Sequence, residues 1–195
     1  MLRDAIRSFV AILAFTVICG VAYPAVVWAI GQGAFTHQAN GSIVKVNGKP
    51  VGSSMIGQTF TSARYFHPRP TALAVNGKEF YDASTSGGSN WGPNSKDLAA
   101  LVAARLEAVE KTYGVTARQV PADMVTASFS GLDPDISVQN AKIQAPVVAR
   151  ARGIAVSTVL DLISKRTDDP TLGFLGATRV NVLDLNLALD RSAST

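Results

Sequence analysis

The hydrophobic pattern divides the chain into one long apolar run and a longer, mixed remainder. From Ser8 to Ile30 there are 23 consecutive residues without a charge, of which 19 are apolar. About 20 apolar residues in a helix span the hydrocarbon core of a bilayer, whereas the apolar part of a cleaved signal peptide covers only about 7–15 residues. The pattern therefore predicts an uncleaved transmembrane helix over residues 8–30, a short N-terminus over 1–7 and a separate domain over 34–195.

Charges beside the apolar run predict its orientation. Arg3 and Arg7 precede the run, and only Asp4 opposes them. Basic residues next to a transmembrane helix stay on the cytoplasmic side, and long domains are exported largely regardless of their charge. We therefore expect residues 1–7 in the cytoplasm, a single pass through the inner membrane, and residues 34–195 in the periplasm.

Small side chains recur along one stripe of the predicted span at spacings of three and four. Such a stripe lets another helix approach closely in lipid, although alanine is common in transmembrane helices generally. Pro24 lacks an N–H and should loosen the helix near Gly20. The candidate helix-packing face consists of Ala11, Ala14, Ile18, Ala22, Ala25 and Ala29.

Beyond the span, local signals predict a mixed α/β (α+β) domain. Asn47-Gly48 supplies the positive φ angles of a tight turn, so residues 42–46 and 49–53 should form a β-hairpin. Residues 57–94 are rich in Gly, Pro, Ser, Thr and Asn, with aromatic residues between them. This composition predicts a long, ordered loop that is pinned by its aromatic side chains.

The second half of the domain should contain three helices and two strands. The first helix begins at a cap formed by Asn94 or Ser95 and ends at Gly114. The remaining expected elements are a short strand over 124–128, a turn over 132–135, a helix from Ser137 to Arg152 interrupted at Pro146, a helix over 155–166, and a strand over 180–189 in which Leu alternates with polar or small residues.

Composition limits the class of protein. The chain has 195 residues, a net charge of +4 and one cysteine, Cys19, which lies inside the apolar run. One cysteine cannot form an intramolecular disulfide, and a single span cannot build a multispan transporter by itself. Without the apolar run the remainder has an ordinary globular composition, which excludes a disordered chain.

Few residues of the domain suggest catalysis or metal binding. His37 and His67 are thirty residues apart with no cysteine near them, which is typical of surface or packed histidines rather than a zinc site. Asp133 and Asp135 flank a proline and could be either a metal pair or a simple turn. The S-x-x-K pattern at residues 42–45 lies in a predicted strand and not at a helix start. We therefore expect neither a catalytic centre nor a metal site.

One loop could contact a ligand. Residues 86–90 read Ser-Gly-Gly-Ser-Asn, in which the glycines let backbone N–H groups approach an anion and the side chains add further donors. The alternative is a tight, glycine-permitted loop held by Trp91. The residues alone leave both interpretations open.

Ordered motifs run along nearly the whole chain. They are Gly52-Ser53-Ser54, Ile56-Gly57-Gln58, Tyr65-Phe66, Arg69-Pro70, Ser86-Gly87-Gly88-Ser89-Asn90 with Gly92-Pro93, and residues 121–128, 130–134 with Ile136-Ser137, 148–153, 179–183 and 185–190. Together with the single N-terminal span they resemble one family, the small C subunit of the bacterial Kdp-type potassium-transporting ATPase. Two positions depart from the family pattern: Phe129, where the family often has glycine, and Asp135, where it often has histidine.

The resemblance implies a non-catalytic subunit of a four-subunit complex in the inner membrane. The implied partners are a channel-like potassium-binding subunit, a P-type ATPase subunit and a small F subunit, with membrane lipid around them and no nucleic acid. The implied role is to stabilise assembly and to act as a catalytic chaperone that raises the ATP affinity of the ATPase subunit. No covalently bound cofactor is expected, and potassium is the transported ion. The family proposal assigns nucleotide contact to Ser86, Gly87, Gly88, Ser89 and Asn90.

The expected sidedness leaves several mechanisms open. A bilayer of about 30 Å would separate a periplasmic loop from cytoplasmic ATP. The domain could still raise ATP affinity by favouring one conformation of a partner, or it could cap the extracellular mouth of the potassium path. The rival class is a membrane-anchored periplasmic small-molecule-binding protein or enzyme, which the Gly/Ser/Asn-rich loop with its aromatics also permits.

Overall fold

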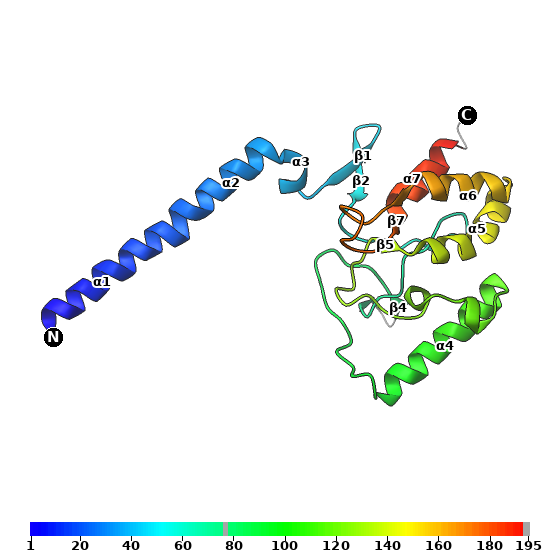
Figure 1. Cartoon of the computed structure of the whole chain (residues 1–195), viewed down its shortest axis with the longest axis horizontal. Helices are drawn as coiled ribbons and strands as arrows, with labels where there is room; N and C mark the ends of the chain where they lie inside the picture. The colour runs from blue at the N-terminus through cyan, green and yellow to red at the C-terminus, as the bar shows by residue number, and fades with distance from the viewer. Residues whose placement is uncertain (76–77, 193–195) are drawn as a thin grey trace. The chain divides into compact units, whose positions relative to one another are not determined.

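A computed structural model describes residues 1–75 and 78–192 of the chain (Figure 1). The chain divides into two compact units, Met1–Val44 and Lys45–Thr195. The first contains the apolar helix and the second contains most of the mixed helix and sheet structure. The two units are therefore described separately.

The first unit is dominated by one continuous helical segment. It consists of α1 (Leu2–Val17), a π-helical turn η1 (Ile18–Ala22) and α2 (Tyr23–Ala34). The segment Leu2–Ala34 is long and apolar enough to cross a membrane, and α1, η1 and α2 contain no buried residue. The helix thus extends beyond the predicted residues 8–30 at both ends.

The loosened backbone expected near Pro24 is confirmed. The π-helical turn lies immediately before this proline, where the carbonyl four residues earlier, at Gly20, has no proline N–H to accept from. A π turn absorbs the lost hydrogen bond by widening one turn of the helix. A single turn, α3 (Thr36–Ala39), follows the apolar segment.

The predicted β-hairpin is confirmed. Strands β1 (Ile43–Val46) and β2 (Lys49–Ser53) pair with each other. Asn47 has φ 50° and Gly48 has φ 77°, the left-handed pair that a two-residue turn requires.

The long loop predicted over residues 57–94 is also confirmed. In its described part, the strands are β3 (Ala74–Val75) and β4 (Lys78–Glu79), paired antiparallel. Phe66 and Tyr81 are buried and pin the loop to the domain. Phe80 and Trp91 remain more than 40% exposed, so only part of the aromatic set acts in this way.

Two of the expected helices lie close to their predicted ranges. In α4 (Lys96–Tyr113), the Ser95 hydroxyl accepts a hydrogen bond from the Leu98 N–H, and Gly114 ends the helix with φ 67°. In α6 (Val156–Lys165), Ala155 holds the cap position. Both helices match their predicted ranges within one or two residues.

The predicted interruption at Pro146 is wrong. Helix α5 (Val138–Arg152) runs through this proline, with Ser137 as its N-cap and Gly153 beyond its end. Pro146 and Lys142, whose carbonyl loses its partner, are both exposed, so water can satisfy that carbonyl. The opposite, buried face of the helix keeps its packing against the core, so the helix continues through the proline.

The strand predicted over 124–128 is wrong. The chain there forms two short 3₁₀ turns, η2 (Ala117–Gln119) and η3 (Ala122–Met124), and then an irregular segment. The N–H groups of Val125 and Thr126 both donate to the Ala122 carbonyl. These local hydrogen bonds replace a strand ladder.

The strand predicted over 180–189 is wrong for most of its length. Strand β7 (Arg179–Asn181) ends after three residues, and α7 (Val182–Ser192) follows. The Asn181 side chain caps the helix by accepting from the Asp184 N–H. Burial then recurs with the helical period, on Val182, Leu183, Leu185, Asn186, Ala188 and Leu189.

A small antiparallel sheet and three helices enclose the core. In the sheet, β7 lies between β5 (Asp135–Ile136) and β6 (Thr167–Asp168). The turn predicted over 132–135 is therefore partly wrong, because Asp135 already belongs to β5. Helix α5 packs on α6 and α6 on α7, as the upper right of Figure 1 shows. The core cluster is formed by Phe66, Ile136, Ala141, Ala145, Val148, Ala149, Val159, Ile163, Val180, Val182, Leu185 and Leu189.

Candidate functional site

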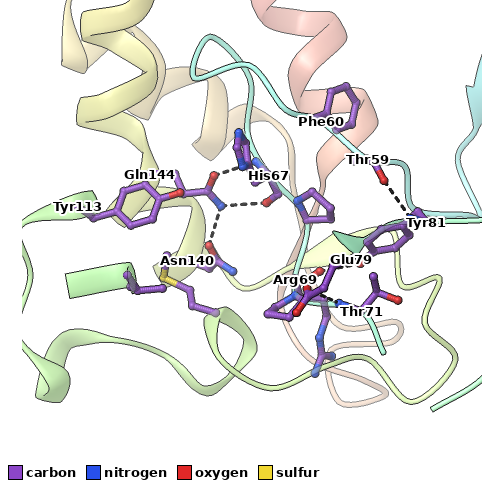
Figure 2. Close-up of a pocket in the computed structure, with 14 residues that line it drawn as sticks. Thr59, Phe60, His67, Arg69, Thr71, Glu79, Tyr81, Tyr113, Asn140 and Gln144 are labelled. Carbon is purple, nitrogen blue, oxygen red and sulfur yellow. Dashed lines mark hydrogen bonds between the residues drawn. The ribbon is translucent and has the colours of Figure 1, made fainter. Parts of the chain in front are cut away.

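Two buried amides clamp an extended segment, residues 65–71, between helices α5 and α7. The Asn186 side chain accepts from the Phe66 N–H at 2.7 Å and donates to the Phe66 carbonyl at 3.0 Å. The Gln144 side chain makes the same pair of bonds with His67, at 2.8 and 3.0 Å (Figure 2). Each amide thus acts on one residue of the segment as a neighbouring strand would. We call residues 65–71 the clamped segment.

A polar chain fixes the amide on α5. The Gln144 amide nitrogen also donates to the Asn140 oxygen at 2.8 Å, as Figure 2 shows. The Asn140 nitrogen in turn donates to the Asp123 carboxylate, which also accepts from the Ser137 N–H and hydroxyl. Asn140 and Gln144 are at most 3% exposed, so this connected chain satisfies polar groups that burial would otherwise leave unpaired.

A cavity of about 260 Å³ lies beside the clamped segment (Figure 2). Tyr81 and Tyr113 line it, and burial raises the pKa of both phenols, with the Asp133 carboxylate adding to the rise at Tyr81. The Tyr81 hydroxyl donates to the Arg69 carbonyl at 2.8 Å. The amides of Asn140 and Gln144 at the cavity wall are already committed to the bonds described above. The arrangement supports the clamped segment and does not present these groups to a ligand.

The end of the clamped segment holds a second loop, residues 128–133. Arg69 forms an ion pair with Asp133 at 2.9 Å, and both side chains are largely shielded. The Ser128 N–H donates to the Pro70 carbonyl at 3.0 Å, and the Thr71 hydroxyl donates to the Gly131 carbonyl at 2.9 Å. Three consecutive residues therefore position this loop. Within the described chain, Arg69 Nε is the buried side-chain nitrogen or oxygen that has no hydrogen-bond partner.

The Ser-Gly-Gly-Ser-Asn loop packs directly against residues 128–131. The Ser86 hydroxyl and the Gly87 N–H both donate to the Ser130 carbonyl, at 3.0 and 2.9 Å. A Cβ at Gly88 would lie 2.9 Å from the Phe129 carbonyl oxygen, so only glycine lets the two backbones approach this closely. The donors of the first two residues thus face the protein.

These contacts bring together segments that are far apart in sequence. The residues around an open hollow of about 910 Å³ come from five of the motif segments and from positions between them, where Met55 and Phe129 are large, exposed apolar side chains. Met55 is 68% exposed and Phe129 is 86% exposed. We call this surface the motif face. It consists of Met55, Ile56, Arg69, Ser86, Gly87, Gly88, Asn90, Ser128, Phe129, Ser130, Leu132, Asp133 and Pro134.

Strand β7 ties a further motif to the motif face. The Asn181 amide donates to the Ser54 carbonyl at 2.9 Å and to the Asp135 carboxylate at 3.2 Å. Asp135 also pairs with Arg179 at 3.0 Å. Burial raises the pKa of the Asp135 carboxyl; Arg179 opposes the rise, and Asp133 adds to it.

The residues for which a metal site was considered have other surroundings in the structure. His37 is exposed on α3, while the His67 backbone is held by Gln144. Asp133 and Asp135 each pair with a different arginine. Over residues 1–75 and 78–192, no group of three or more His, Cys, Asp or Glu side chains could hold a metal ion. Within the S-x-x-K pattern, residues 43–45 lie in β1, as expected.

Two predicted sets remain predictions. The small-residue stripe lies on the exposed helical segment, where Ile18 and Ala22 fall within the π turn. For the loop over residues 86–90, Asn90 adopts φ 56° and lines the motif face, and the Ser89 hydroxyl accepts from the Trp91 N–H at 3.5 Å. The positions of Ser89 and Asn90 do not test whether this loop contacts a nucleotide.

The buried amide residues that hold the clamped segment were not predicted from the sequence. Asn140 and Gln144 are four apart on the buried face of α5, and Asn186 lies among the leucines of α7. An amide on the apolar stripe of a predicted helix was the available signal, because a buried amide requires a partner. The identity of that partner could not be read from the spacing.

Comparison with known proteins gives consistent matches over the whole chain. A family model described as "K+-transporting ATPase, c chain", named KdpC, matches residues 5–191. A potassium-transporting ATPase KdpC subunit from Mycobacterium tuberculosis (strain ATCC 25618 / H37Rv) is 50% identical over 192 residues, covering 98% of this chain and 100% of the relative. The KdpC subunit from Geotalea uraniireducens is 47% identical over 191 residues, covering 97% of each chain, and that from Gemmatimonas aurantiaca is 46% identical over 195 residues, covering 100% of this chain and 96% of the relative.

Proposed function

We propose a function from one premise: this chain belongs to the KdpC family, the c chain of the K⁺-transporting ATPase. It is a subunit of a potassium-transporting ATPase. Within that complex it is a non-catalytic subunit that stabilises assembly with a channel-like potassium-binding subunit, a P-type ATPase subunit and a small F subunit. Its apolar helix anchors it in the inner membrane, with the N-terminus cytoplasmic and the mixed α/β domain periplasmic.

The motif face is the observation that carries this proposal. It gathers five motif segments and is supported through the clamped segment by the core helices α5 and α7. Its exposed Met55 and Phe129 give the folded domain little buried area, and exposed large apolar groups mark interaction surfaces. A rigid surface of this kind suits docking onto a partner subunit.

The same surface can affect the ATPase subunit without touching ATP. A domain that binds one conformation of its partner more tightly shifts the partner toward that conformation and so changes its ligand affinity. Raised ATP affinity, the chaperone role, follows from such coupling. Ser86 and Gly87 direct their donors toward the Ser130 carbonyl, which favours a docking role for this loop over nucleotide contact.

A substitution on the motif face tests the docking role. Phe129→Ser removes an exposed phenyl ring and leaves the fold intact, so we expect weaker recovery of the partner subunits when this chain is affinity-purified in mild detergent. Loss of about 2 kcal/mol of apolar burial corresponds to about thirtyfold weaker binding. Leu160→Ser, at an exposed position of α6 outside the motif face, is the matched control. Equal recovery with both variants would contradict the docking role.

A labelling experiment tests the sidedness and, with it, nucleotide contact. Ser89→Cys in a Cys19→Ala background provides one thiol in the loop over residues 86–90. We expect a membrane-impermeant thiol reagent to modify it in intact spheroplasts. Modification only after lysis would place the loop with cytoplasmic ATP, and would favour nucleotide contact over the proposal.

A further inference from the structure

The loop between β6 and β7 carries an exposed apolar tip. Leu172, Phe174 and Leu175 are 78%, 73% and 51% exposed. From Pro170 to Thr178 the sequence contains no charged residue. Three large apolar side chains within four residues at one loop tip contribute nothing to the core of the domain. We call residues 171–175 the apolar finger.

Four of the five backbone N–H groups of the apolar finger donate to carbonyls of the same loop. Thr171 and Leu175 exchange two hydrogen bonds, each of 2.9 Å, as an isolated antiparallel bridge. The Gly173 N–H donates to the Pro170 carbonyl at 2.9 Å, and the Phe174 N–H donates to the Thr171 carbonyl at 3.4 Å. Because most of its N–H groups are paired within the loop, the tip loses few hydrogen bonds to water when it enters an apolar layer, and this lowers the cost of entry.

Leu172 stands in an unfavourable conformation. Its φ is 57°, in the left-handed region that glycine and asparagine adopt far more easily. A leucine that is both strained and exposed costs the folded domain backbone strain and returns little buried apolar area. Strain of this kind persists where a side chain has a role outside the fold.

We propose that the apolar finger inserts into the interfacial layer of a lipid bilayer and gives the domain a second membrane contact. Protein interfaces are rimmed by polar groups and carry regular hydrogen bonds, whereas residues 172–177 offer no polar side chain. A lipid surface requires only apolar area, which enters to about 5–10 Å at the boundary of headgroups and acyl chains.

The chain keeps a bilayer within reach of the domain. The apolar helix ends at Ala34 and the domain begins at Lys45, so residues 35–44 join them. These ten residues cover at most about 35 Å when fully extended. Such a tether gives the apolar finger a high effective concentration at the membrane surface. The inference rests on the membrane anchor of the proposed function and not on the docking role.

Depth-dependent fluorescence quenching tests the insertion. The full-length chain, with Cys19→Ala and Phe174→Cys, is labelled with the fluorophore NBD and incorporated into phosphatidylethanolamine and phosphatidylglycerol vesicles. Part of the lipid carries a spin label near the headgroup end of the acyl chain. We expect a blue shift of the NBD emission at position 174 and loss of its fluorescence to the spin label. Either orientation of the chain places the domain beside a bilayer surface.

Two matched positions make the outcomes distinct. Thr112→Cys, exposed on α4, should report water and no quenching, whereas Val21→Cys, inside the apolar helix, should be quenched. Quenching at 21 without quenching at 174 overturns the apolar finger's role and leaves the anchor intact. Absence of quenching at both positions overturns the anchor and the inference together. A shift at 174 that needs the partner subunits would assign the apolar finger to a protein interface and also overturn the inference.

A second variant separates lipid contact from folding. Leu172→Asn with Leu175→Ser removes two apolar side chains at exposed positions and relieves the strained φ at position 172. We expect loss of quenching at 174 with no fall in the unfolding temperature. Undiminished quenching in this variant would show that the apolar side chains do not hold the loop in lipid.

Discussion

Asn186 should be among the most sensitive polar positions in the domain. Its side chain is 2% exposed and supplies both hydrogen bonds of the Phe66 backbone, which is 120 residues away in sequence. Asn186→Ala removes both bonds and leaves an N–H and a carbonyl buried without partners. Phe66 itself is fully buried in the core, so neither group can reach water without opening the core.

The expected loss follows from these two groups. Each buried group left unpaired costs about 1–3 kcal/mol, so Asn186→Ala should lower the free energy of unfolding by about 2–6 kcal/mol. A typical domain is stabilised by roughly 5–15 kcal/mol, so this loss is a large part of the total. Gln144→Ala removes the same pair of bonds from His67, but Gln144 lines the cavity of Figure 2, where water can replace the amide. We therefore expect a smaller loss at Gln144.

Urea unfolding of the full-length chain in mild detergent, followed by near-ultraviolet circular dichroism, measures these differences. Gln139→Ala is the control, because Gln139 is exposed and its amide donates one bond to the Gln119 carbonyl at 2.7 Å. Its effect should stay within about 0.5 kcal/mol, as for most surface substitutions. An Asn186→Ala chain as stable as the Gln139→Ala chain would refute the role of the amide clamp.

Two further predictions concern a carboxylate and a strained residue. Burial raises the pKa of Asp135 above its ordinary value of 3.8, so the folded state binds this proton more tightly than the unfolded state, and the contribution of Asp135 to stability falls as pH rises through that raised pKa. In urea titrations at a series of pH values, Asp135→Asn should gain stability relative to the native chain as pH rises from 3.8, and a constant difference would contradict this. Leu172→Asn should raise the unfolding free energy by about 1 kcal/mol in the same assay, because the left-handed conformation costs leucine about 1–2 kcal/mol and asparagine less; a lower stability would show that Leu172 packs in the fold.

The elements predicted well are those whose signals are local. The hairpin turn at Asn47-Gly48, the serine cap of α4 and the glycine that ends it each act within a few residues, and all three are confirmed. The apolar run is likewise a property of one continuous segment. Backbone geometry and capping are set by near neighbours, so the sequence alone is sufficient for them.

The incorrect predictions have longer-range causes. The alternating leucines of residues 183–189 suit a strand, but the helical burial pattern includes Asn186, which is polar and is buried because it holds Phe66. Before residues 124–128, the Asp123 carboxylate accepts hydrogen bonds from Ser137 and Asn140. These contacts favour a 3₁₀ turn at this point of the chain. Neither partner is visible in a local window of sequence.

The site shows the same division. The Ser-Gly-Gly-Ser-Asn loop was recognisable from its sequence, but its hydrogen-bond donors could have faced either solvent or the protein. The structure turns Ser86 and Gly87 toward the Ser130 carbonyl and brings Phe129 to the surface. Which polar groups of a loop remain exposed depends on the backbone segment that packs against it.

The amino-acid sequence by itself determined the long apolar helix, the family, the hairpin and most helices, because each depends on composition, short-range geometry or ordered motifs. Only the tertiary structure decided that buried amides on α5 and α7 clamp residues 65–71 and that Arg69 and Thr71 then hold the motif face. A buried polar group must find a partner, but which partner it finds depends on chain segments that meet only when the domain folds.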